Sequence, residues 1–189
     1  MQEMRLVEAN TREQIQKIRK LYEDAFPKCE KKPFWLINRR KKQGLVDIWE
    51  LQDEAGFAGL AIMMKAGDLV LLDYFAVDTQ RRGSGCGSKA LQCLQEHYEK
   101  QRLFLEIESV YGEAENQKDR ERRKKFYLTN DMEEMGILVD VFGTEMELLT
   151  YQCSLTYEEY LSVYRQVYGE RKAGKLKFIA DLKEIKDKI

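Results

Sequence analysis

The sequence lacks the features that mark membrane, secreted and metal-binding proteins. It has no run of roughly 18 apolar residues, and its first five residues are not followed by an apolar segment typical of a secretory leader. Its single histidine, His97, and its four scattered cysteines form no clustered set of metal ligands. We therefore expect a cytoplasmic protein with reduced thiols, no bound metal and no membrane association.

The sequence also lacks an excess of charge of either sign. Its 32 Lys and Arg residues nearly cancel 33 Asp and Glu residues, which gives a formal net charge of -1 at pH 7. Because binding to nucleic acid through phosphates favours a strongly basic surface, this balance argues against a nucleic-acid partner. With 189 residues and 43% apolar composition, the chain is long enough for one globular domain and a short extension.

The first half of the chain shows patterns typical of strands and helices. Asn10 or Thr11 can cap a helix that ends near Ala25, and Pro33 lies near the first turn of a second helix. Apolar runs separated by glycine turns indicate an antiparallel meander. The expected strands are residues 4–8, 45–51, 57–65 and 69–77, and the expected helices are residues 11–25 and 33–37.

The second half continues with a helix to about Lys100 and a strand at 102–108. A helix that connects two strands in this way implies a parallel pair, so the sheet is expected to be mixed. The remaining expected elements are a polar loop at 112–121, a basic helix at 122–130, strands at 136–142 and 145–153, and helices at 156–168 and 176–185.

Together these patterns predict an α/β (α+β) fold with a mixed, mostly antiparallel central sheet flanked by helices. We expect residues 1–153 to form one domain and residues 154–189 to form a C-terminal helical extension packed on or beside it. The last helix, which is amphipathic, would serve either packing or the formation of a homodimer.

Residues 78–88, Asp-Thr-Gln-Arg-Arg-Gly-Ser-Gly-Cys-Gly-Ser, place two arginines and three alternate glycines between a buried strand and a helix. Glycine lets a backbone approach a ligand closely, and a helix N-terminus presents free N–H groups and the positive end of its dipole. Arg81 or Arg82 can add a charge-assisted hydrogen bond to a phosphate. The loop is therefore an expected anion-binding site.

A dinucleotide-binding oxidoreductase is one interpretation of this loop. That fold needs GxGxxG directly after a strand and an acidic residue about 20 positions further on, a role open to Glu106 or Glu108. Ser88 occupies the third glycine position, however, and an antiparallel meander precedes the loop instead of a parallel βαβ unit. Both features disfavour this interpretation.

Residues 77–88 resemble the acetyl-CoA signature, (Q/R)xxGxG/A, of the GCN5-related N-acetyltransferases (GNAT). The resemblance extends over about residues 4–153, because the order of the expected elements is similar, including Leu105-Glu106-Ile107 and Phe126-Tyr127. It implies a GNAT-like fold, acetyl-CoA as co-substrate and direct acetyl transfer, in a ternary complex, to a primary amine of a small molecule or peptide. A CoA-binding module without turnover is the alternative.

The resemblance also implies which residues bind the cofactor. Phe75, Ala76 and Val77 would offer backbone groups to the pantetheine arm and the acetyl carbonyl, and Asn116 would contact the cofactor from a later loop. The residues expected to bind the pyrophosphate are Arg82, Gly83, Ser84, Gly85, Cys86, Gly87 and Ser88. A helix N-terminus can lower the pKa of Cys86, which we interpret as a space-filling residue and not as a nucleophile.

Acetyl transfer to an amine needs a proton acceptor for the amine and a proton donor for the departing thiolate. The resemblance implies that Glu106 accepts the proton, directly or through water, and that Tyr127 donates one to the CoA sulfur. Glu108 lies two residues further on and on the same face of the strand, so the choice between the two carboxylates and water is open. After the tyrosine the family usually has Asn-Gly-Phe, whereas this chain has Asn130-Asp131-Met132.

Overall fold

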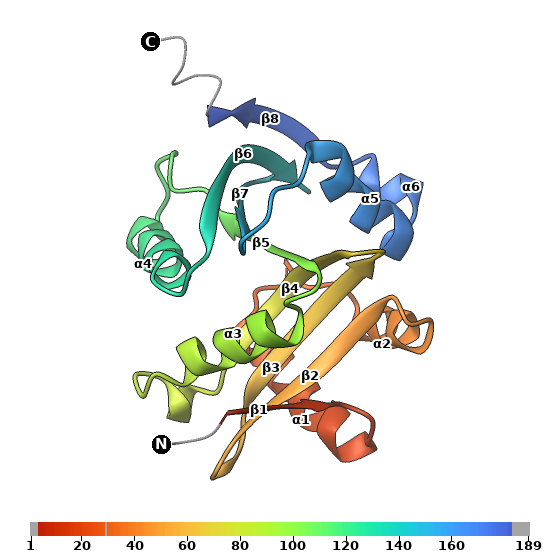
Figure 1. The fold of residues 1–189 in the computed structure, drawn as a ribbon, viewed down its shortest axis with the longest axis vertical. Helices are drawn as coiled ribbons and strands as arrows, with labels where there is room; N and C mark the ends of the chain where they lie inside the picture. Colours follow the sequence, from red (N-terminus) through yellow and green to blue (C-terminus); the bar gives the residue numbers. More distant parts are fainter. Residues whose placement is uncertain (1–3, 29, 183–189) are drawn as a thin grey trace. The chain divides into compact units, whose positions relative to one another are not determined.

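A computed structural model describes residues 4–28 and 30–182, which form eight β-strands and six α-helices (Figure 1). The fold is of the mixed α/β class with mostly antiparallel strand pairing, as the sequence predicts. The chain divides into two compact units, residues 1–65 with 72–99 and residues 66–71 with 100–189. None of the helices in the described ranges is long and apolar enough to cross a membrane.

The first unit carries the expected strands and helices in the expected order. Its strands follow the order β1-β2-β3-β4, and both β1 with β2 and β2 with β3 pair antiparallel. In Figure 1, α3 lies over these strands. The elements are β1 (Arg5–Glu8), α1 (Arg12–Ala25), α2 (Phe34–Lys42), β2 (Val46–Asp53), β3 (Gly56–Ala66), β4 (Leu69–Val77), a 3-10 turn (Thr79–Arg81) and α3 (Cys86–His97).

Local signals set the ends of α1 and α2. Thr11 caps α1 in a capping box with Gln14, which selects between the two predicted cap residues. The helix α2 continues past the expected residues through Lys42, and its last turn consists of four basic residues. Positive charges near a helix C-terminus interact favourably with the helix dipole, so the basic segment extends the helix.

Hydrogen bonds from Tyr22 on α1 and Tyr74 on β4 hold the segment that precedes α2 in place. The Tyr22 hydroxyl donates to the carbonyl oxygen of Lys32 at 2.8 Å, and the Tyr74 hydroxyl donates to that of Glu30 at 2.8 Å. The Lys32 ammonium binds the carboxylate of Asp73 at 2.6 Å. Burial raises the pKa of both tyrosines, so both hydroxyls remain donors.

The aromatic residues near the start of α2 divide between core and surface. Tyr22 and Phe34 are buried, and their rings lie 5.4 Å apart. Trp35, by contrast, is 65% exposed. The first two residues therefore belong to the core of the first unit, as aromatic residues at this spacing usually do.

Gly59 on β3 lies against the backbone of β4. A Cβ atom at this position would stand 2.3 Å from the carbonyl oxygen of Ala76 and 3.1 Å from the Cα of Val77. These are backbone atoms of a neighbouring strand, and they cannot move aside as a flexible side chain would. The close approach of the two strands therefore requires glycine here.

We expect Gly59→Ala to lower the free energy of unfolding by about 1–3 kcal/mol, because the added methyl group overpacks the contact between the strands. Chemical denaturation measures the change. Gly112→Ala is the matched control, since a Cβ at Gly112 would meet no atom within 4 Å and its φ is not positive. Equal unfolding free energies for the two variants would contradict the steric role of Gly59.

The second unit combines antiparallel strands with three helices. Its strands follow the order β5-β7-β6-β8, and all three pairings are antiparallel. The turn between β6 and β7 is the predicted hairpin tip at Gly143. The elements are β5 (Arg102–Glu108), α4 (Gln117–Leu128), β6 (Glu133–Val141), β7 (Thr144–Thr150), α5 (Tyr157–Tyr168), α6 (Glu170–Ala173) and β8 (Lys177–Asp181).

The predicted amphipathic helix at 176–185 is wrong over residues 177–181. Lys177–Asp181 form β8, which pairs with β6, and residues 183–185 lie outside the described residues. Phe178 and Ile179 are 49% and 43% exposed, so their spacing does not mark one buried helix face. A short apolar run fits a strand or a helix, and pairing with the edge of β6 decides between them.

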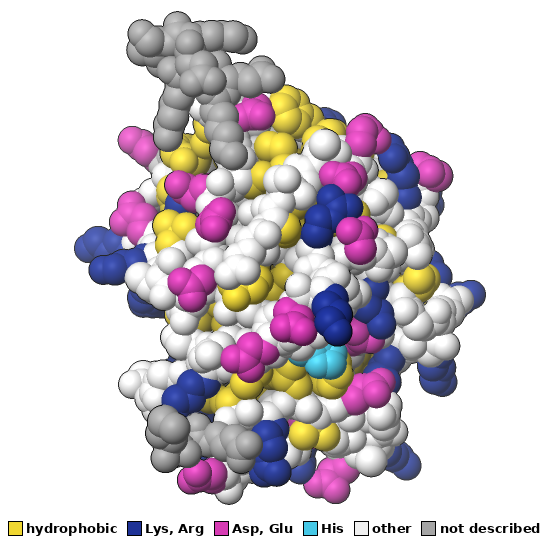
Figure 2. All heavy atoms as spheres, viewed as in Figure 1, with side chains coloured by type: hydrophobic (Ala, Val, Ile, Leu, Met, Phe, Trp, Pro, Cys, Tyr) yellow, Lys and Arg dark blue, Asp and Glu magenta, His cyan; other side chains and the backbone are white. Residues whose placement is uncertain are grey.

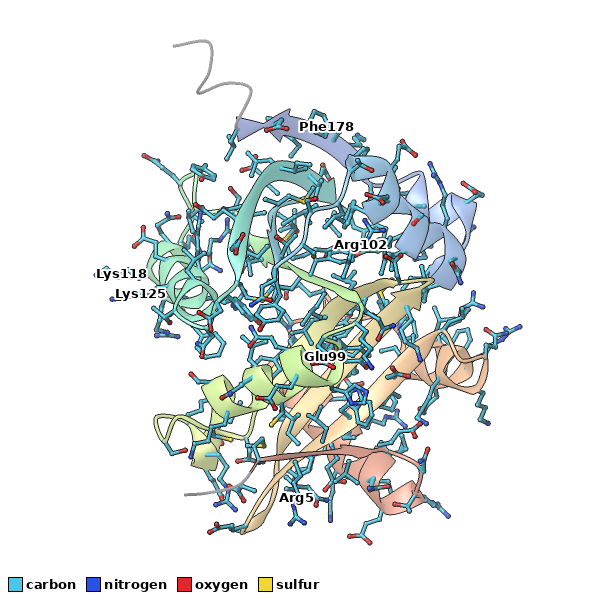
Figure 3. All side chains as sticks on the ribbon, in the orientation of Figure 1. Arg5, Glu99, Arg102, Lys118, Lys125 and Phe178 are labelled. Atoms are coloured by element: carbon cyan, nitrogen blue, oxygen red, sulfur yellow. The ribbon has the colours of Figure 1, made fainter. Side chains whose placement is uncertain are left out.

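The predicted start of the basic helix is also wrong, because α4 begins at Gln117 and not at residue 122. Residues 117–121 are mostly good helix formers, and Asp119 stands in the first turn, where the helix dipole favours an acidic residue. The Gln117 side chain also donates to the carbonyl oxygen of Val110 at 2.9 Å. In Figure 3, Lys118 and Lys125 point away from the strands of this unit.

Arg102, at the start of β5, links β5 to the turn before β4 and to α5 (Figure 3). Its guanidinium group lies 2.8 Å from the carboxylate of Asp68 and 2.8 Å from that of Glu159. Glu159 also completes the predicted capping box with Thr156 at the start of α5. One carboxylate therefore caps the helix and holds it near β5.

Candidate active site

The glycine loop follows β4 and leads directly into α3. Gly83 and Gly85 have φ values of +79° and +77°, a conformation that other residues rarely adopt. A Cβ atom at either position would meet no atom within 4 Å. Ser84 is held by a hydrogen bond from its hydroxyl to the carbonyl oxygen of Arg81 at 2.7 Å. The loop thus presents exposed backbone beside open space.

The N-terminus of α3 is free to bind an anion. Gly85 is its N-cap residue and supplies no side-chain hydrogen bond, and the first turn contains no acidic residue. The first N–H groups of a helix have no partner within it, and they carry the positive end of the dipole. Gly87 and Ser88 lie in this first turn. The loop and the helix end therefore fit a phosphate or pyrophosphate group.

The two arginines of the loop differ in their contacts. Arg81 approaches Asp53 at 3.6 Å and the carbonyl oxygen of Ala55 at 3.4 Å. Arg82 is exposed, and its Nε donates to the carbonyl oxygen of Val77 at 3.4 Å. Since Arg81 already contacts a carboxylate, Arg82 is the better candidate for binding a phosphate.

The predicted pKa shift of Cys86 is wrong in direction. The side chain is 6% exposed, and burial together with the charge of Asp53 raises the pKa of its thiol. Desolvation disfavours the thiolate and outweighs the helix N-terminus. The burial is consistent with the interpretation of Cys86 as a space-filling residue.

Phe75, Ala76 and Val77 are the last three residues of β4 and lead into the loop. Ala76 is buried, whereas Phe75 and Val77 are partly exposed. The strand register is held next to them by a hydrogen bond from the N–H of Asp78 to the carbonyl oxygen of Ala58 at 2.8 Å.

Glu108, on β5, is bound by two arginines of α4. Its carboxylate lies 2.9 Å from Arg120 and 3.1 Å from Arg123. Asn116 completes this group, because its Oδ1 accepts a hydrogen bond from Arg120 at 2.8 Å and its Nδ2 approaches Glu108 at 3.3 Å. Both Glu108 and Asn116 therefore help to hold α4 against β5.

Glu106, two residues earlier on β5, contacts two tyrosines of α5. Tyr160 donates its hydroxyl to Oε1 at 2.7 Å, and Tyr164 donates to Oε1 at 2.9 Å. Neither tyrosine is among the site residues predicted from the sequence. Their spacing of four residues places them on one face of a helix, but nothing in the sequence connects that face to Glu106.

Tyr127 lies in the last turn of α4 and is 8% exposed. Burial raises the pKa of Tyr127 to about 12, although the nearby charge of Arg123 acts in the opposite direction. Within the described part of the chain, no hydrogen bond engages its hydroxyl. The hydroxyl is therefore protonated at neutral pH and can donate its proton.

Asp131, which stands where the family usually has the glycine of Asn-Gly-Phe, has a positive φ. Its φ is +63°, in the left-handed region that Asp tolerates better than most residues. The following N–H, that of Met132, donates to the carbonyl oxygen of Tyr127 at 3.1 Å. Residues 129–132 thus form a turn that ends α4 after Tyr127.

The second unit also contains a pocket of about 120 Å³ beside an irregularity in β6. Lys124 lies next to it, binds Glu134 and Glu147, and stands 4.8 Å over the ring of Tyr111. Burial alone would lower the pKa of Lys124, but the hydrogen bonds that its ammonium donates to both carboxylates raise it. The lining residues are Tyr111, Glu134, Gly136, Ile137, Leu138, Glu147 and Leu182. None of the predicted site residues lines this pocket.

Charged side chains of both signs are intermingled on the face drawn in Figure 2, around the single histidine. Among the described residues, no group of three or more His, Cys, Asp or Glu side chains is arranged to hold a metal ion.

Solved structures with low sequence identity share this fold. A protein from Bacteroides thetaiotaomicron assigned to the GNAT acetyltransferase family is 18% identical, covers 89% of this chain and 99% of its own, and has a TM-score of 0.69. The ribosomal-protein-S18-alanine N-acetyltransferase from Escherichia coli is 15% identical, with coverage of 84% and 97% and a TM-score of 0.59. The aminoglycoside 6'-N-acetyltransferase from Enterococcus faecium is 13% identical, with coverage of 78% and 95% and a TM-score of 0.61.

Among curated protein sequences, none matches the chain significantly. A sequence profile of the acetyltransferase (GNAT) family, however, matches residues 14–128, more than half of the chain. The matched region includes the glycine loop, Glu106 and Tyr127, and it leaves the dinucleotide-binding interpretation without support. The chain therefore belongs to the acetyltransferase (GNAT) family, whose general reaction is acetyl transfer from acetyl-CoA.

Proposed function

We propose that the protein transfers an acetyl group from acetyl-CoA to a primary amine of a small molecule or peptide, by direct transfer in a ternary complex. The observation that carries this proposal is the exposed loop with Gly83 and Gly85 at positive φ, which leads into the uncapped N-terminus of α3. Two structural neighbours are named as N-acetyltransferases, one of a ribosomal protein alanine and one of aminoglycosides, which supports an amine acceptor.

Bound acetyl-CoA supplies a thioester whose carbonyl carbon is open to attack by the amine and whose thiol is the leaving group. In our proposal the loop residues from Arg82 to Ser88 hold its pyrophosphate through backbone N–H groups and the Arg82 guanidinium. The backbone of Phe75, Ala76 and Val77 holds the pantetheine arm. Asn116 is the least supported of the proposed cofactor contacts, because its amide already bonds to Arg120 and Glu108.

Glu106 is the proposed base. Transfer forms an N–C bond and breaks a C–S bond, while one proton leaves the amine and one reaches the sulfur. Glu108 is a poorer candidate, because an incoming amine would have to displace its ion pairs with Arg120 and Arg123. We propose that Glu108 anchors α4 and that Glu106 accepts the proton, directly or through a water molecule.

Tyr127 is the proposed acid. A tyrosine whose hydroxyl is protonated and has no partner in the described part of the chain can donate to the departing thiolate. Burial raises the pKa of Tyr127 to about 12, which keeps that proton in place at neutral pH.

The setting of the reaction is also a proposal. We propose a cytoplasmic enzyme with reduced thiols, in agreement with the free thiols of Cys86, Cys93 and Cys153; Cys29 lies outside the described residues. The interspersed charges favour an acceptor other than a nucleic acid. Homodimer formation is a separate prediction, which sedimentation analysis of the full chain tests.

We expect Gly85→Val to weaken acetyl-CoA binding at least roughly tenfold, since valine is strained at φ +77° and its side chain would occupy the open space beside the loop. Calorimetric titration measures the affinity. Gly44→Val is the matched control, because Gly44 has a φ of +74° and equally open surroundings. Unchanged affinity in folded Gly85→Val would remove the loop from the proposed site.

We expect Glu106→Gln to reduce kcat by roughly 10²-fold or more, because glutamine cannot accept the proton, while acetyl-CoA affinity stays unchanged. Release of free thiol across a panel of primary amines measures turnover. Glu108→Gln should instead lower thermal stability and reduce kcat less than about tenfold. Acetyl-CoA binding by the wild type without turnover on any amine would indicate a CoA-binding module.

We expect Tyr127→Phe to lower kcat by roughly 10²-fold or more, with little change in acetyl-CoA affinity. Its Tm should match that of the wild type, since the hydroxyl has no hydrogen bond to lose within the described residues. Tyr151→Phe serves as the control, because Tyr151 lies in the same unit and its hydroxyl accepts a hydrogen bond from Gln152. Wild-type kcat for Tyr127→Phe at saturating acetyl-CoA would refute the assignment of the acid.

A further inference from the structure

We propose that Tyr160 and Tyr164 of α5 are positioning residues for Glu106, which keep its carboxylate ionised and fix its orientation. The proposal deepens the proposed function and rests on it, because it supplies the support that a proton acceptor at Glu106 needs. It also gives a role to a helix that the sequence indicated only as part of a C-terminal extension.

The geometry of the three side chains carries the proposal. Tyr160 donates to Oε1 of Glu106 at 2.7 Å, and Tyr164 lies 2.9 Å from Oε1 and 3.1 Å from Oε2. Both tyrosines are fully buried. Because one hydroxyl reaches both oxygens and the other reaches a single oxygen, rotation of the carboxylate would break at least one hydrogen bond.

The tyrosine rings are themselves held in place by aromatic neighbours. The two rings lie 5.6 Å apart, and Tyr160 also contacts Phe104 and Tyr157 at 6.3 and 6.0 Å between ring centroids. Tyr164 contacts Phe142 at 6.3 Å. Close packing restricts such buried rings to one rotamer, so the hydroxyls have fixed positions.

The electrostatic effect favours the ionised carboxylate. Burial, with the negative charge of Glu106 as the next cause, raises the pKa of Tyr160 well above its ordinary value, so its hydroxyl keeps its proton. A hydrogen bond donated to a carboxylate stabilises the charged form more than the neutral form. Only the charged form can accept a proton from the acceptor amine, and the two hydroxyls extend its population to lower pH.

Most of the other carboxylates on the surrounding elements are paired with a lysine or arginine. The other titratable groups on these elements are Arg102 and Glu108 on β5, Glu145 and Glu147 on β7, and Tyr157, Glu158, Glu159, Arg165 and Tyr168 on α5. The carboxylates of Glu108, Glu147, Glu158 and Glu159 each form an ion pair with a lysine or arginine. Removal of a tyrosine hydroxyl should therefore act on Glu106 itself.

The test compares Tyr160→Phe, Tyr164→Phe and the double variant with Tyr157→Phe. Tyr157 lies on the same helix, but its hydroxyl donates to the carbonyl oxygen of Leu176, so it controls for loss of a hydroxyl from α5. The acid limb of the kcat profile should move to higher pH by about one pH unit in the double variant and by less in each single variant. The acetyl-CoA affinity should stay within about threefold of wild type.

A direct titration of Glu106 separates this proposal from the proposed function. In protein labelled with ¹³C at glutamate side-chain carboxyls, the Glu106 signal is the one missing in Glu106→Gln, and its midpoint should rise in the double variant and stay unchanged in Tyr157→Phe. An unmoved midpoint in the double variant, or in Tyr164→Phe if the double variant does not fold, overturns the proposal. A raised midpoint together with full turnover in Glu106→Gln would sustain the effect of the tyrosines and overturn the assignment of the base.

Discussion

A charged side chain that becomes buried on folding needs an oppositely charged partner. Ion pairs of this kind attach helices and loops to strands within each unit. In the first unit, the ion pair of Lys32 with Asp73 ties the segment before α2 to β4. In the second, Lys124 joins α4 to β6 and β7 through Glu134 and Glu147. Loss of one partner from a buried pair typically costs about 3–5 kcal/mol, so these contacts fix the positions of the elements that carry them.

The same requirement separates the roles of two carboxylates on one strand. Glu108 is bound by Arg120 and Arg123, and these ion pairs hold α4 on β5. Glu106 accepts hydrogen bonds from tyrosine hydroxyls of α5. A neutral donor orients a carboxylate without the strong attraction of a guanidinium group, so Glu106 is better suited to exchange a proton while Glu108 is better suited to hold a helix.

The glycine loop differs from these paired groups, since its backbone groups face open space. Gly83 and Gly85 adopt positive φ, and the N–H groups at the start of α3 lack a side-chain cap. Such groups are satisfied by water or by an anionic ligand. Gly59 serves a different purpose in the same unit, because its missing side chain admits the backbone of β4.

Much of the fold and part of the candidate site could be predicted from the sequence, because the signals involved are local. The alternation of strands and helices, the capping box at Thr156, the hairpin at Gly143 and the glycine loop depend on residues a few positions apart. The other features depend on packing between elements that are far apart in the sequence. Residues 177–181 form a strand because an edge of β6 is available, and burial sets the pKa of Cys86. The contact of Tyr160 with Glu106 joins residues 54 positions apart, and no local pattern encodes which buried face meets which carboxylate.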